Sequence, residues 1–344
     1  MDKSLLVMSE KELVSALALE KPFQARIIRQ ALLKGVTSFD QMTSLPKAMR
    51  ERLSAEYPSA LMTTVLRRDD SPSAVKLALG LNDGNIVECV RLSDGSDRHT
   101  ACLSSQVGCA MGCSFCRTGT MGLVRNLSSS EIVEQYAQLL SLGEPVSHIV
   151  FMGMGEALQN FEALMDTLQE LHREDGYNIS FRKITISTSG YVPGIRRLSE
   201  LPVPVRLAVS LVSADDEVRS RIMRVNQAYP LSALKEALVS YQRRSGRRIT
   251  LECCLLHNVN TDSMSAQKLY RFARSLDVVV NLIPWNPVPG MDYETPSARE
   301  TSRFADECRR LGLNVTMRRE KGRAINSACG QLATEVRKNT GKRN

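Results

Sequence analysis

Three cysteines stand close together with the spacing Cys-x3-Cys-x2-Cys, at Cys109, Cys113 and Cys116. Thiolates at this spacing can wrap around one metal centre. A structural zinc site takes four protein ligands, and no fourth cysteine or histidine follows at the spacing of a zinc finger. A four-iron cluster also takes four ligands, one for each iron. Three cysteines would therefore leave one iron open to a substrate or cofactor, which is typical of a working metal centre.

The other six of the nine cysteines give weaker signals. An odd number of cysteines argues against a disulfide framework. Cys253 and Cys254 stand in the apolar run 249–256, so we expect both to be buried strand residues. Cys308 lies in a helical pattern and is expected to be buried in the same way. Cys102, taken alone, is also expected to be a buried and inert thiol.

The positive charge of the chain is concentrated near its end. Lysine and arginine number 45 against 37 aspartate and glutamate residues, a net charge of +8, and residues 317–344 carry +6 of it. Arg243, Arg244, Arg247 and Arg248 form a second basic cluster. Basic patches attract nucleic-acid phosphates. The alternative that charge alone leaves open is a solvated surface without a partner.

Composition and hydropathy exclude several classes of protein. The chain is 43% apolar and 24% charged, which is ordinary for a globular protein and argues against long disorder. It has no run of eighteen apolar residues, so we expect no membrane span. The first ten residues lack the apolar stretch of a signal peptide. We therefore expect a cytoplasmic protein of about two domains.

The elements that must hold the cysteines follow an α/β pattern. Residues 1–80 are predicted to be mostly helical, with helices near 23–32 and 47–57, and 81–101 to form a β connector with strand-like alternation. Beyond the cysteines, strand and helix patterns alternate, which predicts a parallel sheet with crossover helices. About six repeats are too few for an eight-fold barrel, so a partial barrel or an open wound sheet fits. The strands are predicted at 148–152, 183–187, 205–211, 248–256, 280–285 and 314–318; the helices at 161–172, 231–244, 263–275 and 297–311, with a capping box at Ser128 and Glu131 opening another.

Polar and small residues follow the ends of several predicted strands. In a parallel sheet these ends meet at one edge, where binding and catalysis are expected. Cys329 follows the last predicted strand. The segments at the strand ends are 153–156, 187–190, 210–212 and 285–287. Their glycines could instead serve only to turn the chain.

The cysteine spacing ahead of an alternating β/α chain resembles the radical-SAM enzymes. Six further motifs resemble those radical-SAM RNA methyltransferases that methylate a ring carbon of adenine, and the match runs from about residue 20 to 332. These motifs are at 104–109, 122–127, 151–156, 186–190, 281–287 and 328–332. The resemblance implies a partial (β/α)6 radical-SAM barrel over 102–332, a small helical N-terminal accessory domain with an RNA contact, and a basic tail at 333–344.

The resemblance also implies cofactors and their ligands. A [4Fe-4S] cluster would be held by the three closely spaced cysteines, and S-adenosylmethionine (SAM) would bind at its open iron. The family usually has Ser-Leu-His where this chain has Ser210-Leu211-Val212, and a valine side chain cannot make a hydrogen bond. The residues expected to contact SAM are Gly155, Glu156, Ser187, Ser210, Leu211, Val212 and Asn286.

Three more residues receive catalytic roles from the resemblance. Cys329 would carry a methyl group from a first SAM as S-methylcysteine, and a second SAM would activate that methyl group. Cys102 would form a transient disulfide with Cys329 as the product leaves. Glu88 would be the proton acceptor.

The implied substrate is carbon 2 of adenosine in 23S rRNA, and in tRNA for dual-specificity members. A flavodoxin-like electron donor and a monomeric state are further expectations from the family. Methylation of carbon 8, as in antibiotic-resistance relatives, is a second hypothesis, although 283–287 resembles the carbon-2 branch more closely. A third hypothesis, a non-catalytic RNA-binding protein whose metal only staples a loop, explains neither the open ligand position nor Cys329.

Overall fold

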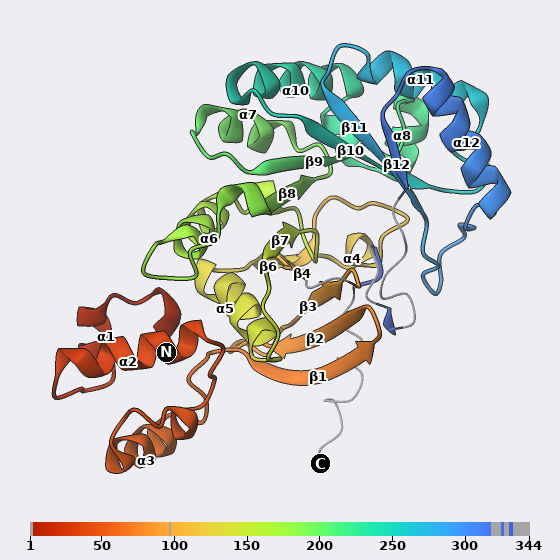
Figure 1. Cartoon of the computed structure of the whole chain (residues 1–344). Helices are drawn as coiled ribbons and strands as arrows, with labels where there is room; N and C mark the ends of the chain where they lie inside the picture. The colour runs from red at the N-terminus through yellow and green to blue at the C-terminus, as the bar shows by residue number, and fades with distance from the viewer. Residues whose placement is uncertain (1–2, 96–97, 318–324, 327–329, 333–344) are drawn as a thin grey trace.

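The computed structural model describes residues 3–95, 98–317, 325–326 and 330–332. Its main feature is a ten-stranded sheet in the order β1-β2-β3-β4-β7-β8-β9-β10-β11-β12, and β5 and β6 form a separate pair. The sheet curves so that its first and last strands lie at opposite ends of an incomplete barrel (Figure 1). The strands are β1 (Thr64–Ser71), β2 (Ala74–Gly80), β3 (Ile86–Ser93), β4 (His99–Cys102), β5 (Gln106–Cys109), β6 (Gly122–Asn126), β7 (His148–Phe151), β8 (Ile184–Thr188), β9 (Arg206–Ser210), β10 (Ile249–Leu255), β11 (Val278–Pro284) and β12 (Val315–Met317).

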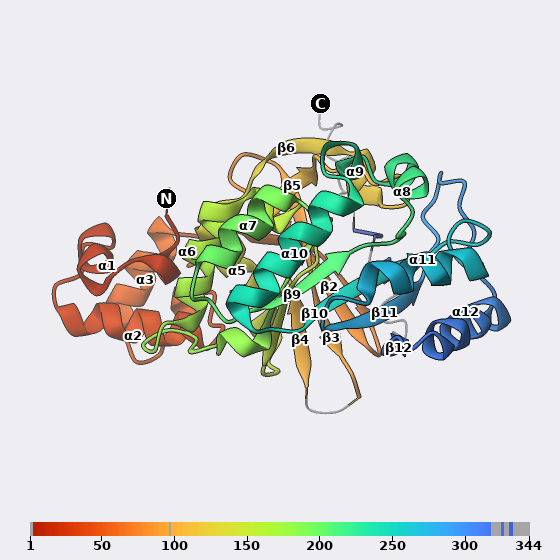
Figure 2. The same ribbon diagram turned by 90° about the horizontal axis from the view of Figure 1, so that it is seen from above.

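The six strands from β7 to β12 are all parallel to their neighbours. Crossover helices return the chain between them and lie along the outside of the sheet (Figure 2). The predicted alternation of strands and helices, with its six strands, is therefore confirmed. The helices are α1 (Glu10–Ala16), α2 (Pro22–Leu33), α3 (Lys47–Glu56), α4 (Arg117–Thr120), α5 (Ser129–Leu140), α6 (Phe161–His172), α7 (Val192–Glu200), α8 (Asp216–Ile222), α9 (Val225–Ala228), α10 (Leu231–Ser245), α11 (Ser263–Ala273) and α12 (Ala298–Arg310), with short 3-10 turns at Leu5–Val7, Phe39–Gln41, Ala157–Gln159 and Phe181–Lys183.

Helix α5 begins where the capping box predicts. The Ser128 hydroxyl accepts the Glu131 N–H at 3.2 Å, and the Glu131 carboxylate accepts the Ser128 N–H at 2.9 Å. Two backbone donors that the first turn would leave unsatisfied are thereby paired. Arg125, on β6, donates to the same carboxylate at 2.8 Å, so the cap also ties β6 to the start of the helix.

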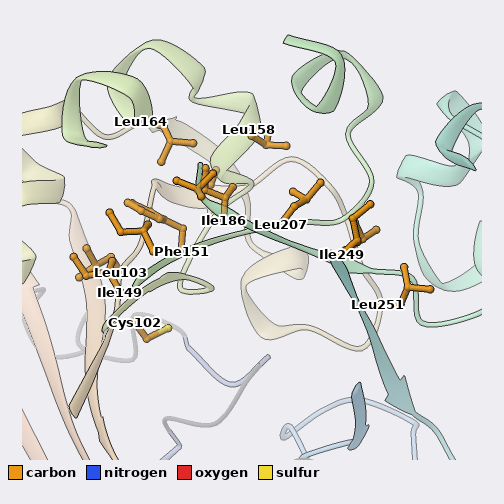
Figure 3. Close-up of a cluster of buried hydrophobic side chains, with 14 of the residues drawn as sticks. Cys102, Leu103, Ile149, Phe151, Leu158, Leu164, Ile186, Leu207, Ile249 and Leu251 are labelled. Atoms are coloured by element: carbon orange, nitrogen blue, oxygen red, sulfur yellow. The ribbon is translucent and has the colours of Figure 1, made fainter. Parts of the chain in front are cut away.

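Strand register divides the side chains of the main sheet between two faces. Ile149 pairs with Ile184, and Phe151 with Ile186, so these apolar side chains share the face that the helices cover. Figure 3 shows Ile149, Phe151 and Ile186 beneath Leu158 and Leu164, with Cys102 on the opposite side of the sheet. We call that opposite side the inner face. Along each strand, side chains that point to the inner face alternate with side chains that point into the apolar core. Many of the polar side chains considered below point to the inner face.

The N-terminal helices have an apolar core of their own. Leu5, Ile28 and Leu53 are fully buried in it, and Val133 and Ala137 of α5 complete the cluster. The helical part predicted for residues 1–80 ends at Glu56, because β1 and β2 already belong to the main sheet. The predicted connector is likewise β3 and β4 of that sheet. Alternation reveals a strand, but only pairing with distant strands reveals to which sheet it belongs.

Two sequence expectations concern residues outside the described ranges. Cys329 is one of them, and the tail at 333–344 is the other.

In the arginine cluster, Arg244 lies 3.8 Å from Glu200 and Arg248 lies 2.8 Å from Asp277, so carboxylates balance two of its four charges. Among the described residues, no helix combines the length and the apolar character that crossing a membrane would need.

Candidate active site

One pocket gathers most of the residues that the sequence singles out. It lies where the parallel strands end, and it also contains the loop that carries the three closely spaced cysteines. Strand ends meet there because the strands are parallel and in register. The predicted site residues that line it are Cys109, Cys113, Cys116, Gly155, Glu156, Ser187, Ser210, Val212 and Asn286.

Hydrogen bonds from distant elements hold the cysteine loop in place. Ser114 N–H donates to the Ile222 carbonyl at 3.0 Å, which fixes the loop to the end of α8. The indole N–H of Trp285, just after β11, donates to the Phe115 carbonyl at 2.9 Å. The loop therefore does not need a metal ion to pair these backbone groups, and its three thiols are presented to the pocket by the fold.

Two glycines allow the close approach that builds this loop and the turn beside it. Gly108 has φ +76°, and a Cβ there would lie 1.9 Å from the Gly122 carbonyl oxygen, so β5 and β6 could not pair beside Cys109. Gly155 has φ +98°, and its Cβ would lie 2.5 Å from Cβ of Gln106. Both positions require glycine for a steric reason, which the motif alone does not reveal.

Glu156 uses its buried carboxylate to brace the turn after β7. One oxygen accepts the Ser189 N–H and hydroxyl, each at 2.7 Å, and the other accepts the Leu158 N–H at 3.3 Å. Burial raises the pKa of this carboxyl, while the Ser189 donors act in the opposite direction. The side chain thus joins the ends of β7 and β8, at the position where the sequence predicts a cofactor contact.

Arg219, which sequence reasoning missed, ties the ends of two strands together. It is fully buried on α8 and donates to the carbonyl of Leu211 at 3.0 Å and to that of Ser189 at 2.6 Å. Burial lowers the pKa of its guanidinium to about 10. Leu211 itself is fully buried and does not line the pocket, unlike Ser210 and Val212 on either side. Nothing in the local sequence of α8 distinguishes this arginine from its exposed neighbours.

Two more residues that the sequence did not identify as functional line the pocket from β10. Glu252 has 7% of its surface exposed, and its carboxylate accepts a hydrogen bond from the Asn281 amide at 2.8 Å. Cys254, expected to be a buried strand residue, is half-buried and contributes to the lining. Cys253 and Cys308 are buried as predicted. An acidic residue inside an apolar strand was the available signal for Glu252, because burial of a carboxylate needs a partner.

Glu88 and Cys102 lie on the inner face of the sheet but do not line this pocket. Cys102 pairs in register with Val90, two residues after Glu88, so both side chains point to the same face. The Glu88 carboxylate forms a buried ion pair with Lys76 at 3.2 Å. The Glu88 carbonyl accepts a hydrogen bond from Ser104 at 2.6 Å, and the same hydroxyl accepts the Met154 N–H at 2.8 Å. The strand with Glu88 is therefore tied to the turn beside the pocket.

Three hydrogen bonds hold the residues on either side of Cys329. Gly330 lines the pocket, and its carbonyl accepts the Arg117 N–H at 2.8 Å. Thr118 donates to the Leu332 carbonyl at 2.7 Å. On the other side, the Asn326 carbonyl accepts a hydrogen bond from Lys76 at 3.4 Å. Asn326 thus lies at the ion pair of Glu88, and Gly330 lies at the cysteine loop.

All three thiols line one pocket, and cysteine thiolates are the ligands that a four-iron cluster takes. Burial raises the pKa of Cys109 to about 12 and also raises that of Cys113, so both are protonated in the metal-free chain and metal binding would release protons. Within the described residues, no three side chains of histidine, cysteine, aspartate or glutamate meet as ligands of a single metal ion. A four-iron cluster does not need three ligands to meet at one ion, because each thiolate binds a separate iron.

Fold and site together define an enzyme of the radical SAM class. The family model described as the Radical SAM superfamily matches residues 103–266, which include the cysteine loop and the strands from β5 through β10. A solved structure described as a radical SAM methyltransferase from Sphaerobacter thermophilus superimposes with a TM-score of 0.87 at 39% identity, over 96% of this chain and 99% of that one.

Two relatives define the family more narrowly. The dual-specificity RNA methyltransferase RlmN of Anaeromyxobacter sp. strain Fw109-5 is 43% identical over 338 residues, covering 94% of this chain and 88% of the relative. The protein of the same name from Anaeromyxobacter dehalogenans strain 2CP-C is also 43% identical, covering 92% and 87%. The chain belongs to the RlmN family of dual-specificity RNA methyltransferases.

Proposed function

We propose that this enzyme methylates carbon 2 of adenosine in 23S rRNA and in tRNA, using two molecules of SAM for each turnover. The observation that carries the proposal is the meeting, in one pocket, of the cysteine loop, the strand ends and Gly330, the residue directly after Cys329. Both relatives described above are named as dual-specificity RNA methyltransferases, and this chain matches them along nearly all of its length.

The pocket offers ligands for both cofactors. Cys109, Cys113 and Cys116 would hold a [4Fe-4S] cluster, and Ser187, Ser210 and Asn286 supply polar groups for SAM at the same cavity. When bound and reduced, the cluster and SAM supply a carbon-centred radical that can take a hydrogen atom from an unreactive methyl group. The protein's part is to place that methyl group and the adenine ring beside it and to keep water away.

Three side chains of this protein carry out the remaining steps of the proposed reaction. Cys329 accepts a methyl group from the first SAM and carries the transferred carbon while it joins the adenine ring. Glu88 then accepts the proton that leaves the substituted ring carbon, while the unpaired electron of the adduct would return to the cluster. The Cys102 thiolate attacks the sulfur of Cys329 and breaks the carbon–sulfur bond, and the former methyl carbon takes up a proton as the methylated RNA is released. The two cysteines are left as a disulfide, which a cellular thiol reductant reopens.

Anaerobic reconstitution tests the cofactor part of the proposal. We expect about four irons and four sulfides per chain, and Cys113→Ala should lose most of both. Reduction in the presence of SAM should yield 5′-deoxyadenosine from the wild-type protein but not from the Cys113→Ala variant. A colourless, zinc-loaded wild-type protein would contradict the proposal.

Nucleoside analysis tests the reaction. RNA treated with the wild-type enzyme should contain 2-methyladenosine; 8-methyladenosine in its place would support the carbon-8 hypothesis instead. Cys329→Ala should still cleave SAM but leave the RNA unmethylated, and Cys102→Ala should accumulate protein covalently joined to RNA. Full turnover by either variant would show that the assigned roles are wrong. The flavodoxin-like donor, the monomeric state and the cytoplasmic location stay predictions.

A further inference from the structure

Lys76, on β2, contacts several groups near the proposed site, but the proposed reaction assigns it no role. Its ammonium lies 3.2 Å from a Glu88 carboxylate oxygen, 3.7 Å from an Asp69 carboxylate oxygen and 3.4 Å from the Asn326 carbonyl oxygen. The Lys76 and Glu88 side chains are 6% and 5% exposed. An ammonium group has three donors, and here it faces three acceptors from three separate parts of the chain.

Strand register explains why these groups meet. Lys76 pairs with Asp69 on one side and with Val90 on the other, and Val90 pairs with Cys102. Paired residues share a face, and so do residues two apart on one strand. Asp69, Lys76, Glu88 and Cys102 therefore all project from the inner face, in neighbouring strands.

The geometry of the ion pair suits a proton acceptor. A buried pair of opposite charges holds both side chains in one arrangement, because either charge alone would be costly to bury. The contact with Lys76 at 3.2 Å thus gives the Glu88 carboxylate a fixed position.

The contact with Asn326 links this pair to the segment that carries the methyl group. Asn326 stands three positions before Cys329 in the sequence and 250 positions after Lys76. A bond from the ammonium to its carbonyl fixes the chain there, while Arg117 fixes it again at Gly330. Lys76 therefore contacts both the proposed proton acceptor and a residue three positions before the proposed methyl carrier.

We propose that Lys76 is a positioning residue for the second half of the reaction: its ammonium holds the Glu88 carboxylate and the Asn326 backbone together, so that the adenine ring carbon is deprotonated efficiently. This inference rests on the proposed function. It predicts a defect that appears after the carbon has joined the RNA and not before.

The test compares two variants with a matched control. Lys76→Gln keeps a hydrogen-bond donor of similar length but removes the charge, and Lys76→Arg keeps the charge. Lys235→Met is the control, because Lys235 also donates to a backbone carbonyl, that of Phe272, at 2.6 Å but lies outside the pocket and the inner face. For each protein, mass spectrometry measures methyl groups on Cys329, RNA covalently joined to protein, and 2-methyladenosine.

We expect Lys76→Gln to methylate Cys329 at close to the wild-type rate. Its formation of 2-methyladenosine should fall by about tenfold to a hundredfold, as for a misplaced catalytic group, and RNA joined to protein should accumulate. Lys76→Arg should recover part of the lost rate, and Lys235→Met should behave as wild type. If Lys76→Gln does not fold, combining it with Asp69→Asn removes one of the two carboxylates that face the lost charge, and the same three measurements apply.

Two results would overturn the role of Lys76. One is wild-type turnover by a folded Lys76→Gln variant, and the other is an equal loss of Cys329 methylation and of product, which indicates general damage. Failure of the proposed function looks different, because the wild-type enzyme itself would then form neither methylated Cys329 nor 2-methyladenosine.

Discussion

Val212 occupies a backbone conformation that valine rarely adopts. Its φ of +60° lies in the left-handed region, although the residue is buried and lines the pocket. Its N–H donates to the Glu252 carbonyl at 3.2 Å, and its carbonyl accepts the Asn260 side-chain amide at 2.8 Å. These two bonds hold a β-branched residue in a conformation that costs on the order of 1–3 kcal/mol. The contacts of Val212 with SAM stay a prediction.

A pair of substitutions that differ by one methyl group tests this strain. Because only glycine adopts the left-handed region without penalty, Val212→Gly should be more stable than Val212→Ala by about 1 kcal/mol. In ordinary helical or extended backbone the order is the reverse. Chemical denaturation of the two metal-free variants provides the measurement, and an alanine variant that equals or exceeds the glycine variant would show that the backbone is not strained.

Helix α5 connects the N-terminal helices to the sheet through buried polar side chains. The Glu134 carboxylate accepts the N–H groups of Met62 at 3.0 Å and of Thr63 at 2.8 Å. The next residue of the helix is Gln135. Its side chain accepts the Ser104 N–H at 2.8 Å and donates to the Ser104 carbonyl at 2.9 Å. The helix thus fixes the chain that enters β1 and the chain that leaves β4 for the cysteine loop.

The pH dependence of stability tests the environment of Glu134. Burial raises the pKa of this carboxyl above its ordinary value of 4.5, so the folded chain holds the proton more tightly than the unfolded chain. The stability that Glu134 contributes is then complete below pH 4.5 and is lost as the pH rises through the raised pKa. Glu134→Gln cannot titrate.

The unfolding free energy of the wild-type protein should therefore fall relative to that of Glu134→Gln as the pH rises from 5 to about 8. Denaturation of both proteins across this range measures the difference. A difference that stays constant, or that grows in favour of the wild type, would show that the two N–H donors outweigh burial and that the pKa is not raised.

At the scale of the whole molecule, α5 belongs to two apolar cores. Its Val133 and Ala137 pack with the N-terminal helices, while Ile132 and Tyr136 pack with the sheet. Because one helix serves both cores, we expect the N-terminal helices and the barrel to unfold in a single transition. The fluorescence of Trp285, the one tryptophan in the chain, reports on the barrel because this residue is buried beside the pocket.

A substitution in the core of the N-terminal helices should therefore also lower the stability of the sheet. Leu53 is fully buried among the N-terminal helices, and Leu53→Ala should lower the unfolding free energy by about 2–5 kcal/mol. If unfolding is a single transition, the Trp285 fluorescence midpoint shifts to lower denaturant, together with the loss of hydrogen-exchange protection in α2. A Trp285 midpoint that does not move, with early exchange in α2, would instead indicate independent unfolding.

Local features of the chain could be predicted from the sequence because their causes are local. The capping box at Ser128 and the strand–helix alternation follow from neighbouring residue types and from the rule that crossovers are short. The cysteine spacing identified the loop that lines the pocket. Most of the residues predicted at the strand ends lie there as well, since parallel strands end at one edge.

What the tertiary structure decided depends on contacts between residues far apart in the chain. The sequence could not show that β1 to β4 extend the same sheet, because register is set by distant partners. The same register brings Lys76, Glu88 and Cys102 to the inner face. Arg219 acquires its role only when the ends of β8 and β9 come within reach of one guanidinium. Residue types and spacing indicated the chemistry, and non-local pairing decided which side chains lie together to carry it out.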